Sequence, residues 1–309
     1  MALIKVNNRG QSDNLGRRNL LDNGSFQVWQ RGAGPFTVNA FGADRWYGWG
    51  NQHNLTREGA TQYHGYSLRV AHNDGGANTF SGIAQTCEYE TAAWTRGKTL
   101  TFSCKLRKGS AFTGILKLEI VERTDSTASI NSGTRNVLIS EEVAITTTST
   151  KFSVTTNSTV SNSAQAIGVN VVHYQTTGTD ANNFFEVEEC QLEVGTIATD
   201  FEFSSLADTL QRCQRFYEQG DVVCRHPFQN QLNHVFSTPV YFKVQKRATP
   251  NVTQANGYTT DGMASYGIEG HGGGGYNSKK DGFVISTTTS TTSNSISMVQ
   301  ADWTASAEL

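Results

Sequence analysis

Proline, charge and paired cysteines are scarce in this chain of 309 residues. It has 4 prolines, and charged residues make up 17% of it, with a formal net charge of -2. The five cysteines are Cys87, Cys104, Cys190, Cys213 and Cys224. They are odd in number and widely spaced, and no CxxC pair occurs, so neither a zinc ribbon nor a thioredoxin motif is supported. We expect small buried thiols that stay reduced.

The chain also lacks a basic stripe, a long apolar run and an apolar leader. Without a basic stripe, binding to the phosphates of nucleic acid is not expected. No apolar run is long enough to span a bilayer, so no membrane insertion is expected. The first eight residues lack the apolar core of a signal peptide, which predicts folding in a cytoplasm whatever the final destination.

Sequence motifs of catalysis and metal binding are missing too. The glycine-rich run 270–275 has no GxxxxGK[ST] pattern and no helix pattern after it, so we interpret it as a loop. The seven histidines form neither HExxH nor a zinc spacing. Glu186, Glu188 and Glu189 share one expected strand, but nothing singles out a facing pair of the kind that glycosidases use. We therefore expect no enzyme.

Ser, Thr, Asn and Gly are abundant, a mixture typical of short strands joined by turns. Apolar and polar residues alternate over 100–106, 116–120 and 167–171, which predicts antiparallel strands with one face on a core. Two segments, Asn19–Gly32 with Ala43–Trp46 and Cys190–Thr196, bracket this region. We interpret them as the first and last strands of one sandwich, closed on each other.

The end of the sandwich shows two local signals. The apolar period slips between Glu188 and Glu189, and a β-bulge there would return the flanking apolar residues to one face. Ser205 and Asp208 form a weak capping box for a helix that Gly220 is placed to stop. Beyond it we expect a strand through 240–244, a loop over 256–281, and final strands over 283–286 and 296–303.

The predicted fold class is all-β: a jelly-roll β-sandwich, a short helix and a smaller C-terminal β-domain. The expected parts are an extended N-terminal attachment arm over 1–18, the sandwich over 19–204, the connecting helix over 205–219 and the C-terminal β-domain over 220–309. Leu3, Ile4 and Val6 are the only apolar cluster of the arm. They would anchor it on a neighbouring chain, and the alternative is a disordered tail.

Aromatic residues crowd the opening of the sandwich. We expect Trp29 and Trp46 to pack in the core. The candidate glycan-binding residues are Tyr47, Trp49, Tyr63 and Tyr66. Their flat faces would stack on sugar rings while nearby polar side chains bind the hydroxyl groups.

Several segments resemble tail-fibre-like virion proteins of bacteriophages, especially marine ones. They are Gly16–Phe26 with Trp29–Gly32 and Ala43–Trp46, the closure Gln191–Gly195, Leu210–Tyr217, Phe242 with Lys246–Pro250, and Trp303–Leu309. The resemblance covers nearly the whole chain except its middle. It implies a virion protein, made in the bacterial host cytoplasm, that forms a homotrimer and binds other virion proteins through the arm.

The sandwich portion is similar to the jelly-roll carbohydrate-binding modules found beside glycoside hydrolases. Those modules often hold a structural calcium ion near the first and last strands. Asp22, Asn23 and Glu188 would supply its ligands here. No other cofactor is implied.

We therefore expect a non-enzymatic tail fibre or receptor-binding protein that contacts host surface glycans. Many weak sites on one particle would give strong attachment through effective concentration. The alternatives are a head fibre or capsid decoration protein, and a depolymerase that cuts host polysaccharide.

Overall fold

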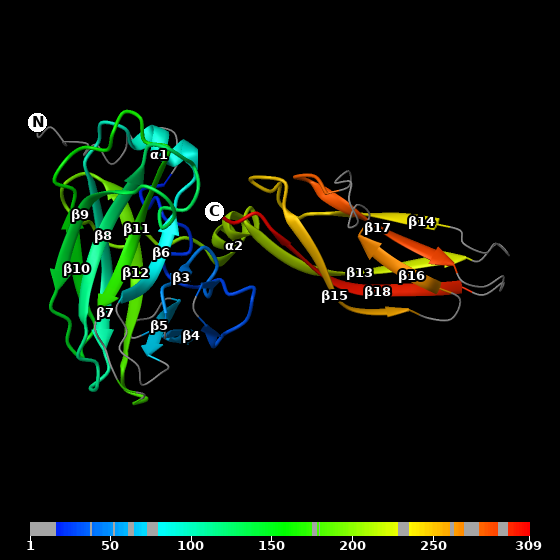
Figure 1. The fold of residues 1–309 in the computed structure, drawn as a ribbon, viewed down its shortest axis with the longest axis horizontal. Helices are drawn as coiled ribbons and strands as arrows, with labels where there is room; N and C mark the ends of the chain where they lie inside the picture. The colour runs from blue at the N-terminus through cyan, green and yellow to red at the C-terminus, as the bar shows by residue number, and fades with distance from the viewer. Residues whose placement is uncertain are drawn as a thin grey trace, which may run out of the picture. The chain divides into compact units, whose positions relative to one another are not determined.

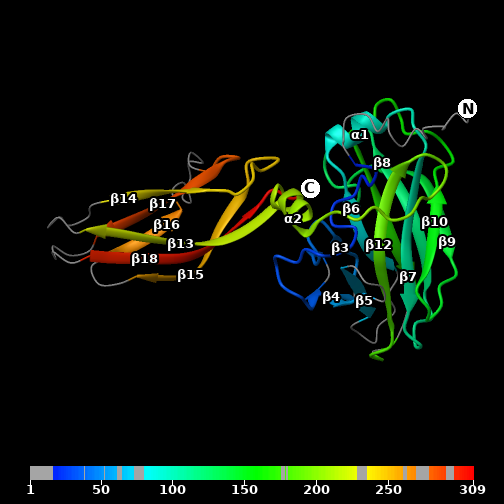
Figure 2. The ribbon, with the colours of Figure 1, turned by 180° about the vertical axis from the view of Figure 1, so that it is seen from behind.

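The computed structural model describes residues 17–37, 39–51, 53–60, 65–72, 80–174, 178, 180–227, 235–259, 263–268, 278–289 and 296–309. The chain divides into two compact units, Met1–Thr209 with Leu309, and Leu210–Glu308. Strands dominate both units and the described helices are short (Figures 1 and 2). The all-β prediction is confirmed.

The first unit is a sandwich of two six-stranded antiparallel sheets. In order across the sheet, sheet A contains β1 (Phe36–Thr37), β4 (His53–Gly59), β5 (Tyr66–His72), β12 (Phe184–Val194), β7 (Leu100–Lys108) and β10 (Thr150–Thr155). Sheet B contains β2 (Ala40–Phe41), β3 (Tyr47–Trp49), β6 (Phe80–Thr86), β11 (Ala166–Tyr174), β8 (Ile115–Arg123) and β9 (Asn136–Val143). From β5 to β8, and again from β9 to β12, the chain crosses between the sheets at each step, as in a jelly roll.

The core lies between the two sheets and is filled by the alternating apolar residues. Sheet A contributes Leu100, Phe102, Cys104 and Leu106, and sheet B contributes Leu116, Leu118, Ile120, Ile167, Val169 and Val171. Trp46 is fully buried in the same cluster, and Trp29 lies at its edge. A helix, α1 (Tyr89–Thr95), follows β6. The inner faces of both sheets are therefore committed to packing, which leaves the outer faces free to meet a ligand.

The predicted bulge in β12 is confirmed. The register of β12 against β7 shifts between Glu188 and Gln191, and Glu189 has a positive φ of 50°. The shift buries Phe185 and Cys190 in one core. It also turns the Cys190 N–H toward the carbonyl oxygen of Gly24, at 2.8 Å. The bulge thus attaches the opening segment of the sandwich to its last strand.

The opening segment is not a strand, which corrects our expectation. Residues 19–35 form turns, and the first described strand is β1. Side-chain hydrogen bonds replace the strand ladder, since Asn19 Oδ1 accepts from the N–H groups of Leu21 and Leu192. The two segments do close on each other, because the Leu20 N–H donates to the Leu192 carbonyl at 2.8 Å.

The predicted arm ends earlier than expected. The backbone N–H of Arg18 donates to Glu202 at 2.8 Å, and Arg17 forms an ion pair with Asp22 at 2.9 Å. Arg17 and Arg18 therefore belong to the sandwich. Leu3, Ile4 and Val6 lie outside the described residues.

The helix begins as predicted but ends early. In α2 (Leu206–Gln214) the Asp208 N–H donates to Ser205 Oγ at 3.1 Å, the expected cap. The expected extent of 205–219 is wrong, because β13 (Tyr217–Pro227) begins three residues after Gln214. Gly220 lies within β13 and does not stop the helix. A Cβ there would lie 2.7 Å from the Trp303 ring, so the glycine makes room for packing.

The second unit contains two three-stranded sheets. One is β13, β18 (Ile296–Ser306) and β15 (Asn251–Thr259), and the other is β14 (Val235–Tyr241), β17 (Gly282–Thr289) and β16 (Met263–Ile268). The final two strands are as predicted. The loop expected over 256–281 is wrong in part, because β15 and β16 occupy much of it. The strand expected over 240–244 stops at Tyr241, and the Phe242 ring packs on Trp303 with centroids 5.7 Å apart.

Candidate functional site

The outer face of sheet B carries a row of aromatic side chains that the core does not use. Side chains alternate along a strand, so residues between the core positions point outward. On β3, β6 and β11 these outward positions include Trp49, Phe80 and Tyr174. We call these three the aromatic row. On the next strand, β8, Ile115 is the register partner of Tyr174, and Lys117 has the same outward parity.

The aromatic row is continuous across three neighbouring strands. The ring centroids of Trp49 and Phe80 lie 5.4 Å apart, edge to face, and those of Phe80 and Tyr174 lie 5.9 Å apart in a stacked pair. Lys117 Nζ lies 5.1 Å from the centroid of the Tyr174 ring. Phe80 is 44% exposed and Ile115 is 39% exposed. The row is therefore an apolar platform open to solvent, with one cation at its edge.

Polar groups lie beside the platform on the same face. Glu119 accepts hydrogen bonds from Ser140 Oγ at 3.0 Å and from Asn170 Nδ2 at 3.3 Å. Within the described residues, the buried Asn170 Oδ1 and Trp49 Nε1 meet no hydrogen-bond partner. A buried polar atom without a partner is costly. An acceptor and a donor thus lie buried next to the flat apolar rings, without a partner among the described residues.

A loop between β8 and β9 covers the other end of this face. Ile130 is fully buried against Ala84, Val121 and Ala166 of the sheet. Arg123 holds the loop, because its guanidinium donates to both carboxylate oxygens of Asp125, each at 2.9 Å, and to Ser132 Oγ at 2.7 Å. Trp49 packs against this covered cluster, and the exposed apolar part of the described face lies at Phe80 and Ile115.

The structure separates the four aromatic residues predicted from the sequence. Tyr47 and Trp49 lie on β3 and share the outer face of sheet B. Tyr66 lies on β5 in sheet A, 37% exposed, with the Arg57 guanidinium 4.5 Å from its ring centroid. Tyr63 lies outside the described residues. Sequence reasoning missed Phe80 and Tyr174, although the outward parity of Tyr174 beyond the alternating 167–171 run was a usable signal.

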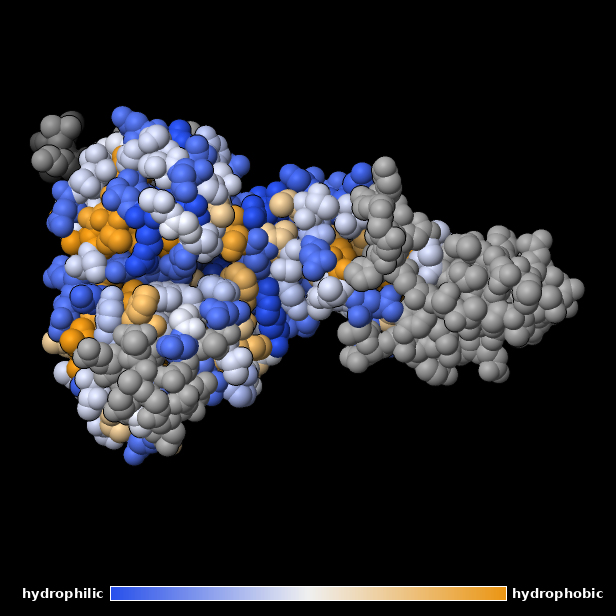
Figure 3. Space-filling view, in the orientation of Figure 1, coloured by the Kyte–Doolittle hydropathy of each residue, from blue (hydrophilic) through white to orange (hydrophobic). Residues whose placement is uncertain are grey.

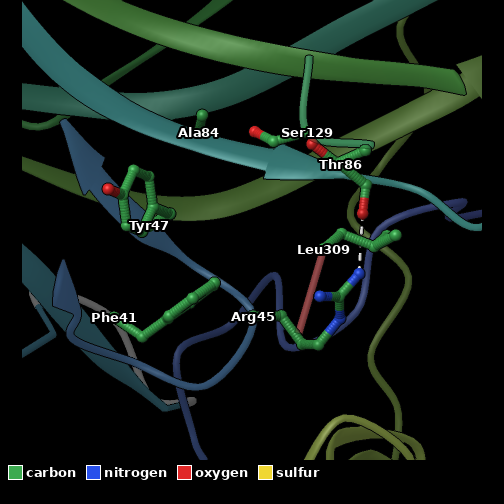
Figure 4. Close-up of a pocket in the computed structure, with 7 residues that line it drawn as sticks. All are labelled: Phe41, Arg45, Tyr47, Ala84, Thr86, Ser129 and Leu309. Carbon is green, nitrogen blue, oxygen red and sulfur yellow. Dashed lines mark hydrogen bonds between the residues drawn. The ribbon is translucent and has the colours of Figure 1, made fainter. Parts of the chain in front are cut away.

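A small hollow adjoins Tyr47 and is too small for a sugar. Its cavity volume is about 10 Å³, and its walls include Phe41, Tyr47, Arg45 and Thr86 (Figure 4). That volume holds about one water molecule. The Arg45 guanidinium donates to the Thr86 carbonyl at 2.6 Å, as the dashed line in Figure 4 shows. Tyr47 therefore borders the platform without opening a deep pocket.

The face of the sandwich seen in Figure 3 is mostly hydrophilic where its residues are coloured. In the view of Figure 3, apolar side chains of the first unit form small separate patches among hydrophilic ones. Exposed apolar residues scattered singly are normal on a folded protein, whereas larger contiguous patches mark binding sites. In that view, small apolar areas rather than one broad apolar face are available for recognition.

The predicted calcium ligands are engaged in other contacts, and we correct this prediction. Asp22 forms ion pairs with Arg17 at 2.9 Å and Arg45 at 3.5 Å, and two cations beside a carboxylate oppose binding of a third. The Asn23 amide spans a buried turn: Nδ2 donates to the carbonyls of Val28 and Asp44, and Oδ1 accepts from the Val28 N–H. Glu188 is buried in β12 at the bulge. The donor set does not fit a calcium ion.

The five cysteines are buried free thiols. Burial raises the pKa of the Cys87 thiol to about 12 and that of Cys190 well above its usual range, so these thiols stay protonated. Among the described residues, no group of three or more His, Cys, Asp and Glu side chains could hold a metal ion. The helices described here are also too short to cross a membrane.

Comparison with known proteins identifies no family. No protein-family model and no curated protein sequence matches the chain. Among solved structures, the enzymatically active domain of tailspike protein 4 of bacteriophage CBA120 matches with 13% identity and a TM-score of 0.37 over 57% of this chain. The match covers only 21% of that tailspike chain.

Two further matches show how varied these structures are. A CBM4 carbohydrate-binding module has 16% identity and a TM-score of 0.34, over 56% of this chain and 99% of the module. A cyclase from Fischerella sp. TAU has 13% identity and a TM-score of 0.40, over 59% of this chain and 99% of the cyclase. Likenesses this distant carry no argument about function. The site must be interpreted from its own geometry.

Proposed function

We propose that this chain is a non-enzymatic phage virion protein, a tail fibre or receptor-binding protein, whose sandwich binds host surface glycan on the outer face of sheet B. The observation that carries the glycan-binding part is the aromatic row of Trp49, Phe80 and Tyr174, with Lys117 beside the Tyr174 ring. A sugar ring has an apolar face and a rim of hydroxyl groups; the aromatic row would meet the apolar face and the Lys117 ammonium would donate to a hydroxyl group. The virion role, the homotrimer and the location on the particle rest on the sequence resemblance described above.

Replacing the exposed rings should weaken glycan binding. We expect Phe80→Ser and Tyr174→Ser each to lower affinity for host-envelope polysaccharide about tenfold, the loss typical of truncating an aromatic anchor. Tyr241→Ser is the matched control, because Tyr241 is an exposed aromatic of the second unit, 77% exposed. Binding is measured with the full chain by calorimetry or on a glycan array.

Equal binding by the wild type and both variants would contradict this site, and absence of any binding by the wild type would contradict glycan recognition itself. The same mixtures also test for catalysis. We expect no new reducing ends to appear in the polysaccharide. Their accumulation would favour a depolymerase.

Deleting the attachment arm should separate folding from assembly. Because Arg17 and Arg18 contact the sandwich, the deletion is limited to residues 1–16. We expect the shortened chain to keep its unfolding midpoint and to be lost from assembled particles, as measured by labelled antibody on purified virions. Normal incorporation would show that the anchor lies elsewhere in the chain.

A further inference from the structure

Three histidines meet inside the sandwich, behind the aromatic row. His53 on β4 and His72 on β5 are register partners. His173 on β11 reaches them from the other sheet, with its ring centroid 6.0 Å from that of His53. All three are buried. We call these residues the histidine cluster.

The histidine cluster has few partners that could stabilise a positively charged, protonated ring. His173 Nε2 and Ser81 Oγ share a hydrogen bond of 2.5 Å, and His72 Nδ1 lies 3.2 Å from the Gly178 carbonyl. Among the described residues, His173 Nδ1 and His72 Nε2 are buried without a hydrogen-bond partner, and a backbone hydrogen bond at Asn51 favours the charged form of His53. Other contacts come from Gly48 on β3 and Phe185 on β12, neither of which titrates. The ionisable groups that act on His53 and His173 are the other members of the cluster.

The same strand ends hold the histidine cluster and the aromatic row. Ser81 and His173 are register partners on the inner face, and Phe80 and Tyr174 are the next register pair, on the outer face. Each pair joins the start of β6 to the end of β11. The hydrogen bond between Ser81 and His173 therefore adds to the backbone pairing that places Phe80 against Tyr174.

We propose that the histidine cluster is an acid-sensitive clasp: protonation of His53 and His173 separates the ends of β6 and β11 and disassembles the aromatic row. If that row binds glycan, as proposed above, acid releases the glycan. The physical reason is that, among the described residues of the cluster, a buried imidazolium has no counter-charge and would face a second imidazolium. Opening the strand ends lets water hydrate the charged rings, which removes both the cost of burying them and the repulsion between them.

The lowered pKa values of His53 and His173 set the size of the expected acid response. Burial lowers the pKa of His53 from 6.5 to about 4 and that of His173 from 6.5 to about 3, so the closed form favours the neutral rings. The closed form of the clasp is therefore most stable relative to the open form above pH 6.5, and this preference weakens as the pH falls toward 4. At pH 5, each histidine should raise the population of the open form about thirtyfold.

Hydrogen exchange of the full chain tests the clasp without any glycan. We compare pH 7 with pH 5, corrected for intrinsic exchange rates, on peptides covering the start of β6 and the end of β11. Strands β7 and β10 of sheet A serve as internal references. We expect the β6 and β11 ends to exchange at least thirtyfold faster at pH 5, with β7 and β10 unchanged. Unchanged exchange at the β6 and β11 ends, or equal acceleration in all four strands, would overturn the clasp.

Variants and ring titration complete the test. His173→Gln keeps a group that can bond to Ser81 but cannot be protonated, and it should reduce the acid response at least tenfold. His226→Gln, in the second unit, should leave the response unchanged. If the variant fails to fold, NMR titration of the histidine rings in the wild-type chain provides the test instead. Protonation of His173 near pH 6.5 with β6 and β11 still protected would overturn the clasp. If the clasp opens with acid but no glycan binds at pH 7, only the proposed function fails.

Discussion

Lys246→Met is expected to cost the second unit about 3–5 kcal/mol, the usual penalty for breaking a buried ion pair from one side. Lys246 is buried, and its ammonium donates to Glu218 at 2.5 Å, to the Gln214 carbonyl at 2.6 Å and to the Val244 carbonyl at 3.2 Å. All three donors are used. Methionine fills a similar volume, so the loss comes from Glu218, which stays buried without its counter-charge.

A matched control and a double variant separate charge from packing. Lys243→Met removes an exposed lysine from the same segment and should change stability by less than about 0.5 kcal/mol. Lys246→Met combined with Glu218→Met should recover much of the loss, because no buried charge remains. Urea-dependent hydrogen exchange of β13 and β18 measures the second unit, with β7 as reference. A loss below 1 kcal/mol in the single variant would show that Glu218 finds another partner.

This ion pair also shows what a sequence resemblance leaves open. Lys246–Pro250 is one of the segments that resemble phage virion proteins, and its sequence alone assigns no role to the lysine. In the fold, Lys246 joins the end of α2 to β13 through Gln214 and Glu218. The sequence shows that position 246 carries a charge, but the burial of that charge depends on residues in other segments of the chain.

The inner faces of the sheets were predictable and the outer faces were not. Alternation in 100–106 and 116–120 placed core residues correctly, and the slipped period at Glu188 located the bulge. Such patterns are local. The aromatic row depends on the register that joins Phe80 to Tyr174 across 94 positions, and periodicity gives a side chain's face without naming the neighbouring strand. The histidine cluster was hidden in the same way.

The helix end and the opening segment failed for a different reason. Glycine stops helices and also permits close packing, and at Gly220 the ring of Trp303 determined its role. An Asp-Asn-Gly run is typical both of turns and of calcium loops. In both places the residue types are compatible with two local structures, and contacts with residues distant in the sequence determine which structure forms.

Asn23→Asp is expected to destabilise the sandwich by about 3–5 kcal/mol, and calcium should not rescue it. Asn23 is buried at a positive φ of 51°, a conformation that Asn and Asp both tolerate, so the backbone is not the cause. Asn23 Nδ2 donates to the Val28 carbonyl at 2.9 Å and to the Asp44 carbonyl at 3.0 Å. Aspartate cannot donate to either, so it brings a buried carboxylate toward two carbonyl oxygens.

The same substitution separates the turn from a calcium site, because the two predict opposite signs. An added carboxylate would strengthen calcium binding and raise the unfolding midpoint in calcium. In the turn it lowers the midpoint equally with calcium and with EDTA. Asn157→Asp, at an exposed position of the same unit, should change stability by less than about 0.5 kcal/mol. Thermal and urea unfolding of the full chain in both buffers decides the matter, and a calcium-dependent gain in the Asn23 variant would restore the metal site to the opening of the sandwich.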